Sequence, residues 1–237
     1  ANNCLSCHGA SLMRYNQLTK IGLTEAQIKD NLILTDAKIG DMMKSSMMSH
    51  NMDGKSKEWF GAMPPDLSLV ARARGADWLY TYLRTFYKDD SRATGWNNLA
   101  FDKVGMPHVL HALQGEQSMQ HKSFDDHEEA RSFYLELSAP PSSKMFHEEH
   151  KDGKTSYSVS WLQLDKAGTL TSLTEDGKPR TQAYDQAAAD LVNFLSFMSD
   201  PSQTDRKQIG FIILAFLLFV LIPLTYMLKK EYWKDVH

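Results

Sequence analysis

Residues 1–13 read ANNCLSCHGASLM and contain both cysteines of the 237-residue chain, Cys4 and Cys7, with His8 directly after the second. Cys-x-x-Cys-His is the attachment sequence of c-type haem, in which the thiols add to the vinyl groups and the histidine becomes an axial iron ligand. Two intervening residues let both sulfurs reach adjacent edges of one porphyrin. The motif therefore predicts one covalently attached haem c, bound by Cys4, Cys7 and His8.

Two other chemistries use closely spaced cysteines, and the sequence disfavours both. A thioredoxin-like redox pair needs a strand before the motif and a helix at the second cysteine, and the residues around the motif suggest neither. A zinc site needs two more good ligands from a second knuckle, and the chain has no other cysteine. If both cysteines belong to the haem motif, none remains for a structural disulfide.

A haem that only carries electrons needs a second axial ligand, and a methionine thioether is the usual choice when the potential must be high. Of the 12 methionines, Met63 in GAMPPDL and Met106 in DKVGMPHVL precede a proline. Proline fixes its own φ and biases the preceding residue toward an extended conformation, which stiffens a ligand loop. Spacing from His8 leaves the choice between these two methionines open.

Residues 209–228, IGFIILAFLLFVLIPLTYML, contain no charged side chain. A helix of this length spans about 30 Å, the thickness of a bilayer's hydrocarbon core, and buried core helices rarely stay apolar on every face for so long. We therefore expect one transmembrane helix, in which Pro223 introduces a tolerated kink. Three lysines follow the span and two basic residues precede it, which favours a cytoplasmic C-terminus.

This orientation makes residues 1–204 a periplasmic c-type haem domain and residues 205–237 a linker, membrane helix and short cytoplasmic tail. Export requires a signal peptide, which we expect upstream of Ala1 or already removed. Three residues before Cys4 cannot form the helix that usually ends at such a motif, so we expect the mature protein to begin before Ala1. The net charge of −3 gives no basic excess, so no nucleic-acid partner is expected.

Helix signals occur at four places in the first 204 residues, and the segments are 23–33, 66–75, 76–90 and 181–201. In the first, Thr24 predicts an N-cap and Gln27 completes a capping box. In the second, Asp66 predicts the N-cap and Gly75 the C-terminal end. In the third, apolar residues at helical spacing predict an amphipathic helix that packs on the core.

The remaining segments lack a helical period. Residues 36–60 predict mostly loop, and residues 88–107 predict a long loop of the kind that is usually functional. Residues 114–156 are polar and charged, and predict a poorly packed excursion. Residues 157–174 alternate loosely around a Lys-Ala-Gly turn, which predicts a small β-hairpin.

Six histidines lie among many carboxylates after the Met-Pro loop, and they are His108, His111, His121, His127, His147 and His150. HVLH and HEEH place histidines at i, i+3, a spacing that can put two metal ligands on one helical face. We prefer to interpret these residues as a solvated, charged surface that faces a partner, rather than as a metal site. The acidic runs DDHEE and HEEH could steer a basic soluble cytochrome, but the default interpretation of such runs is an ordinary hydrated surface.

Five stretches of the chain resemble the cytochrome c1 family, the haem subunit of the cytochrome bc1 (quinol-cytochrome c oxidoreductase) complex. In order, they are CLSCH (4–8), PPDLSLVARARG (64–75), VGMP (104–107), DLVNFLSFMSDP (190–201) and LKKEYWK (228–234). PPDLS followed by RAR is the most specific of them. The resemblance covers most of the chain but excludes about residues 36–60 and a polar insertion at about 108–156.

The resemblance implies a mainly α fold: a class I c-type cytochrome domain with a small β-hairpin insertion and one C-terminal transmembrane helix. It makes Met106, rather than Met63, the second iron ligand and packs Pro65 beside the haem. It also pairs Arg74 with a haem propionate, which suits a guanidinium fork facing a carboxylate. Trp78 takes an aromatic role in propionate binding.

The function that the resemblance implies is electron transfer in a bacterial inner membrane. The chain would accept an electron from a Rieske iron-sulfur protein and pass it to a cytochrome c, beside cytochrome b in a dimeric complex. It would make or break no substrate bond, so it has no predicted catalytic residue and is an enzyme only as a subunit of the oxidoreductase. Two alternatives stay open: an independent membrane-tethered electron carrier, and a peroxidase-like haem c enzyme with an open axial position.

Overall fold

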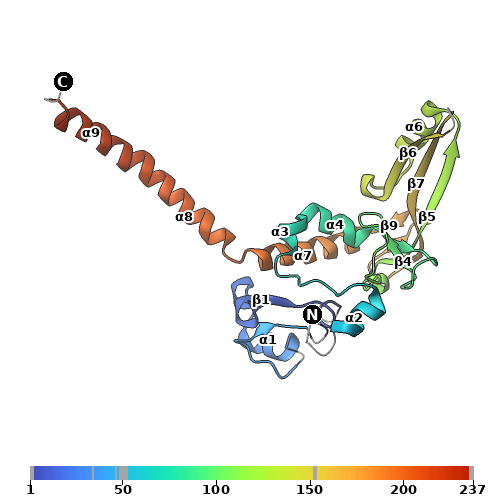
Figure 1. Cartoon of the computed structure of the whole chain (residues 1–237), viewed down its shortest axis with the longest axis horizontal. Helices are drawn as coiled ribbons and strands as arrows, with labels where there is room; N and C mark the ends of the chain where they lie inside the picture. The colour runs from blue at the N-terminus through green and yellow to red at the C-terminus, as the bar shows by residue number, and fades with distance from the viewer. Residues whose placement is uncertain (1–2, 34, 46, 48–52, 152–153, 235–237) are drawn as a thin grey trace. The chain divides into compact units, whose positions relative to one another are not determined.

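The chain divides into two units, Ala1–Ser199 and Asp200–His237, and each is described by itself. The computed structural model describes residues 3–33, 35–45, 47, 53–151 and 154–234. Within these residues, the first unit combines helices with small antiparallel sheets, and the second is one long helix (Figure 1).

A strand directly after the N-terminal motif begins the first unit. Strand β1 (Ala10–Arg14) pairs antiparallel with β2 (Met42–Met43). A 3₁₀ helix (Tyr15–Ile21) and α1 (Glu25–Asn31) lie between them. The predicted capping box of α1 is confirmed: the side chain of Thr24 accepts from the backbone N–H of Gln27, and the Gln27 side chain accepts from the backbone N–H of Thr24.

Helix α2 (Asp53–Phe60) ends a segment for which the sequence predicts mostly loop. The prediction for residues 36–60 is therefore wrong over this helix. Lys57, Glu58 and Trp59 are exposed, so this part of the helix has no continuous apolar face that a search for periodicity could detect.

Helix α3 (Val70–Arg74) ends at Gly75 as predicted, but it begins later than expected. Gly75 has a φ of 87°, in the left-handed region that glycine tolerates best. Asp66 is not the N-cap, because its carboxylate accepts hydrogen bonds from the backbone N–H groups of Ser11 and Ser68, both at 2.8 Å. Leu69 holds the N-cap position instead, and the Asp66 carboxylate bridges the local backbone at Ser68 and the distant segment at Ser11.

Helix α4 (Ala76–Arg84) buries Leu79 and Leu83, as its amphipathic pattern predicts. It ends six residues before the predicted end, because Phe86–Lys88 form strand β3, which pairs with β4 (Trp96–Asn98). The pairing aligns Phe86 with Asn98, so part of the predicted long loop is a second strand. The short helix α5 (His111–Gln114) follows this loop.

The first unit also contains a three-stranded antiparallel sheet, which together with α6 we call the arm (Figure 1). Its strands lie in the order β5, β7, β6, with α6 between β5 and β6 in the chain. The bounds are β5 Gly115–Phe124, α6 His127–Glu136, a 3₁₀ turn Pro141–Ser143, β6 Lys144–Lys151 and β7 Lys154–Ala167.

The arm corrects two predictions from the sequence. Residues 114–156 are not poorly packed, because Phe124, Ala130 and Val159 form a buried cluster of their own between α6 and the sheet. Residues 157–174 do not form a hairpin at the Lys-Ala-Gly turn, because β7 is one strand that pairs with both β5 and β6. These pairings join residues far apart in the chain, which local alternation does not reveal.

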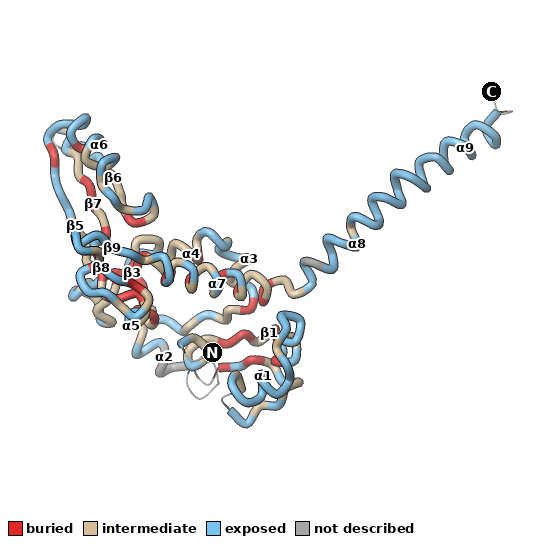
Figure 2. Tube along the Cα trace, turned by 180° about the vertical axis from the view of Figure 1, so that it is seen from behind, coloured by how far each residue is buried: buried red, intermediate tan, exposed pale blue. Residues whose placement is uncertain are grey.

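Helix α7 (Gln182–Ser199) confirms the helix predicted over 181–201 and supplies much of the main core. It follows a small two-stranded sheet of β8 (Ser172–Leu173) and β9 (Pro179–Arg180). The buried side chains of α7 pack with those of β1, α1 and α4, and the buried stretches can be followed in Figure 2. The core includes Met13, Leu18, Ile28, Leu79, Leu83, Tyr184, Val192 and Leu195.

The second unit contains a helix from Asp205 to Tyr232 that is long and apolar enough to cross a membrane. It consists of α8 (Gln203–Phe216), a π-helical turn (Leu217–Leu221) and α9 (Ile222–Tyr232). Pro223 lacks an N–H group, and the wider turn lies directly before it, where Ile222 N–H donates to the carbonyl of Leu217. The helix therefore adapts to the proline by a π turn within the predicted span.

The two hydrogen bonds that the Asp66 carboxylate accepts should contribute to the stability of this fold. Replacing the carboxylate in Asp66→Asn should lower the free energy of unfolding by about 1–3 kcal/mol, because the two N–H groups bond to different carboxylate oxygens and asparagine replaces one of these acceptors with an NH₂ donor. Burial alone would raise the pKa of Asp66, but hydrogen bonds from Ser68 and Ser11 outweigh it and lower the pKa below 3.8. The stabilisation is therefore fully present above pH 3.8, the ordinary pKa of an aspartate, and is lost as the pH falls through the lowered pKa of Asp66.

Chemical unfolding of the wild-type protein and of Asp66→Asn at several pH values measures this effect. Asp30→Asn, at an exposed position of α1, is the matched control. Equal stability of the Asp66 and Asp30 variants at neutral pH would refute the role given to Asp66.

Candidate functional site

The Cys-x-x-Cys-His motif folds into a tight turn. The backbone N–H groups of Cys7 and His8 both donate to the carbonyl of Cys4, at 3.1 and 2.8 Å. Both thiols are unpaired and half-buried, and burial raises the pKa of the Cys4 thiol. The turn brings the two sulfurs and the imidazole to one short stretch of backbone, as attachment to a single porphyrin requires.

The imidazole of His8 is oriented by a residue from the second motif. Its Nδ1 lies 2.7 Å from the carbonyl oxygen of Pro65. A carbonyl only accepts, so Nδ1 carries the proton and Nε2 keeps an open lone pair. Histidines that bind metals are held in this way, with the second ring nitrogen donating to a backbone carbonyl. His8 and Pro65, both predicted from the sequence, are therefore brought together.

Met106 lies half-buried in the loop between β4 and α5, and its sulfur has a polar partner. The hydroxyl of Tyr82 on α4 donates to Met106 Sδ at 3.3 Å. Burial raises the pKa of this phenol, so it stays protonated near neutral pH. Met63, by contrast, is 48% exposed. The surroundings of Met106 suit a ligand better than those of Met63.

Arg74 and Trp78 lie next to this methionine group. The Arg74 guanidinium lies over the Trp78 ring, 5.0 Å from its centroid, and also faces the ring of Phe101. Trp78 stacks on Tyr82 at 5.0 Å, which links Arg74 to the partner of Met106. Among the residues that the structure describes, no carboxylate forms a salt bridge with Arg74. Its N–H donors are therefore available for an anionic group such as a propionate.

An apolar cavity of about 390 Å³ opens beside Cys4. Most of its wall is hydrophobic, with the side chains of Leu110, Leu113 and Leu191. Of the predicted site residues, Cys4 lines this cavity. An oriented imidazole, two thiols outside any disulfide, a half-buried thioether and a guanidinium without a carboxylate partner are the groups that a haem c requires. The residues present therefore fit this cofactor.

The structure thus forms two groups of predicted residues. One comprises Cys4, Cys7, His8 and Pro65, and the other Arg74, Trp78 and Met106. The groups are joined through the main hydrophobic core, which includes Leu5 of the motif and both Trp78 and Tyr82 of α4. Sequence reasoning missed Tyr82, although its place four residues after Trp78 puts both rings on one helical face.

His108 corrects the expectation that the histidines after the loop are solvated. It is 3% exposed and stacks on Phe86, with ring centroids 4.8 Å apart. Burial, and then the neighbouring His111, lower the pKa of His108 to about 4. It is therefore a neutral core residue near neutral pH. In the described part of the chain, no group of three or more His, Cys, Asp or Glu side chains is arranged to hold a metal ion.

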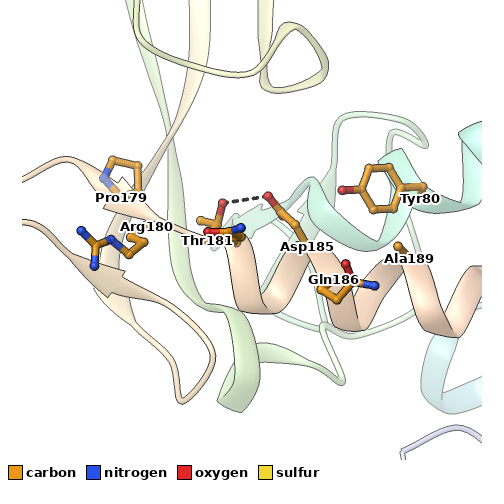
Figure 3. Close-up of a pocket in the computed structure, with 8 residues that line it drawn as sticks. Tyr80, Pro179, Arg180, Thr181, Asp185, Gln186 and Ala189 are labelled. Atoms are coloured by element: carbon orange, nitrogen blue, oxygen red, sulfur yellow. Dashed lines mark hydrogen bonds between the residues drawn. The ribbon is translucent and has the colours of Figure 1, made fainter.

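A polar cleft of about 430 Å³ lies apart from these groups, at the start of α7 (Figure 3). Asp185 accepts there from the hydroxyl of Thr181 at 3.0 Å and pairs with Arg84 at 2.6 Å. None of the predicted site residues lines the cleft, so it is not part of the candidate site.

Comparison with known proteins identifies the family of the chain. The sequence model described as "Cytochrome C1 family" matches residues 1–132 and 161–236. The chain belongs to the cytochrome c1 family. Cytochrome c1 of Allochromatium vinosum is 40% identical to it, over all of this chain and 81% of that protein.

Two other relatives carry different names. A protein of Nitrosomonas europaea named "Ammonia monooxygenase gamma subunit" is 42% identical, over 99% of this chain and 79% of its own length. A "Cytochrome b/c1" of Bradyrhizobium diazoefficiens is 26% identical over 99% of this chain, which spans 32% of that protein.

The family match omits residues 133–160, which include the end of α6, strand β6 and the first part of β7.

The loop that carries Met106 approaches another backbone at Gly105. A Cβ atom added there would lie 2.4 Å from the carbonyl oxygen of Phe60, at the end of α2. Gly105→Ala should therefore displace the loop and lower the free energy of unfolding by about 1–3 kcal/mol. Gly40→Ala is the control, because an added Cβ there meets no atom within 4 Å. Chemical unfolding of the two variants checks this, and equal stabilities would contradict the close approach.

Proposed function

We propose that this member of the cytochrome c1 family carries one haem c, bound covalently through Cys4 and Cys7, in a class I c-type cytochrome domain. His8 and Met106 would be the axial ligands of its iron. The observation that carries this proposal is the hydrogen bond between His8 Nδ1 and the Pro65 carbonyl, because it leaves Nε2 ready to coordinate a metal. The half-buried position and polar partner of Met106 support it over the exposed Met63.

As a member of the cytochrome c1 family, the chain is the haem subunit of the cytochrome bc1 complex and functions in electron transfer. When bound, the haem supplies a one-electron couple. The protein's own residues would determine its surroundings: His8 and Met106 would hold the iron, Arg74 would offer donors to a propionate, and Cys4 borders a mostly hydrophobic cavity. None of these roles needs a catalytic residue, which fits a chain that only passes electrons.

The finer assignment concerns partners and place. We propose that a Rieske iron-sulfur protein delivers the electron, that a cytochrome c removes it, and that the chain sits beside cytochrome b in a dimeric complex. The helix Asp205–Tyr232 is a candidate membrane anchor. Lys229, Lys230 and Lys234 after the span support a cytoplasmic C-terminus, with the haem domain on the periplasmic side of a bacterial inner membrane.

The ligand assignment has a spectroscopic test. The absorption band of the oxidised protein that arises from thioether coordination should disappear in Met106→Ala and persist in Met63→Ala, because only the first removes a ligand. Both variants should retain covalent haem through Cys4 and Cys7. The opposite pattern of bands would assign the ligand to Met63.

The assembly has a separate test, which also covers the alternative functions. Mild solubilisation of membranes should yield this chain together with cytochrome b and a Rieske protein, identified by mass spectrometry. A lone monomeric cytochrome would favour an independent electron carrier. Recovery with ammonia monooxygenase subunits, as the name of the Nitrosomonas relative suggests for that protein, would also contradict the proposal.

A further inference from the structure

The phenol of Tyr82 is a polar group placed against the sulfur of Met106. Its hydroxyl donates to Met106 Sδ at 3.3 Å. A thioether is a weak acceptor, so this contact depends on how the donor is held. The contact is therefore significant only if the protein fixes the position of the Tyr82 ring.

Two aromatic rings contact the ring of Tyr82. Trp78 stacks on it with a centroid distance of 5.0 Å and an interplanar angle of 13°. Phe86 meets it edge to face, at 5.1 Å and 71°. Aromatic neighbours in these arrangements restrict the ring to one orientation. Packing against these two rings therefore fixes the direction in which the hydroxyl points.

Asn98 ties the same residue to the loop that carries Met106. Its side-chain N–H donates to the backbone carbonyl of Tyr82 at 2.7 Å. Its side-chain oxygen accepts from the backbone N–H groups of Ala100 and Phe101, at 2.8 and 3.2 Å. Asn98 is 1% exposed, so these bonds are shielded from water. Donor and acceptor thus belong to two segments that one buried amide holds together.

We propose that Tyr82 is a positioning residue for Met106, whose hydroxyl holds the thioether and withdraws electron density from its sulfur, so that the reduction potential of the bound haem is raised. The inference rests on the proposed role of Met106 as an axial ligand. A sulfur that shares a lone pair with a donor gives less charge to iron, and the oxidised iron loses more by this than the reduced iron. Outer hydrogen bonds adjust metal centres in this way.

Tyr82→Phe in the full-length haem-loaded protein is the test, because it removes the hydroxyl and keeps the ring. Redox titration should give a lower midpoint potential, with the equilibrium constant for reduction falling severalfold, where tenfold corresponds to about 59 mV for one electron. The thioether band of the oxidised protein should shift but persist. Tyr80→Phe is the matched control, since that phenol lies on the same helix under the Arg84 guanidinium and not against Met106.

The outcomes separate this inference from the ligand assignment. An unchanged potential in Tyr82→Phe, together with loss of the thioether band in Met106→Ala, would overturn the role of Tyr82 and leave Met106 as ligand. Persistence of the band in Met106→Ala would overturn both. If Tyr82→Phe does not incorporate haem, Tyr82→Leu removes the same donor with a smaller side chain. A potential equal to that of the wild type in Tyr82→Leu would refute the proposal.

Discussion

The pairing of residues 8–12 with residues 65–68 is the constraint from which the geometry of the site follows. Leu67 N–H donates to the carbonyl of Gly9 at 2.7 Å, which is a direct bond between the two backbones. Pro65 cannot donate, but its carbonyl accepts from His8. The carboxylate of Asp66 completes the pairing through Ser11. Because the prolines have no backbone N–H to donate, side chains supply part of the hydrogen bonding between the two segments. One of these bonds, between His8 and the Pro65 carbonyl, fixes the tautomer of the imidazole.

The Met106 side of the site depends on packing instead. Trp78 and Phe86 enclose Tyr82, and Phe86 in turn stacks on the buried His108, two residues beyond Met106. The loop is therefore fixed at the methionine by a hydrogen bond and just after it by a ring contact. A neutral imidazole suits this place because a charged ring would need solvent or a counter-ion. The half of the site with the thiols is held by hydrogen bonds, and the other half mainly by aromatic rings.

Local signals explain which parts were predictable from the sequence. The capping box at Thr24, the helix over 182–199 and the long apolar helix depend on neighbouring residues only, and each was predicted. The haem motif is also local. The choice between Met63 and Met106 is not, because exposure and the Tyr82 contact depend on the folded chain. Asp66 is the reverse case: its local pattern suggests an N-cap, but the helix begins later, and one carboxylate oxygen accepts from Ser11, 55 residues away.

The arm is packed around a cluster of its own, and part of it lies outside the family match. Its buried cluster of Phe124, Ala130 and Val159 is separate from the main core that borders the site. At its base, a Cβ on Gly115 would lie 2.0 Å from the carbonyl of Lys166, so only glycine allows the two strands to meet so closely. Residues 133–160, which the family match omits, lie beyond this base. The packing of this segment therefore depends on the arm's own cluster, and none of the predicted site residues belongs to it.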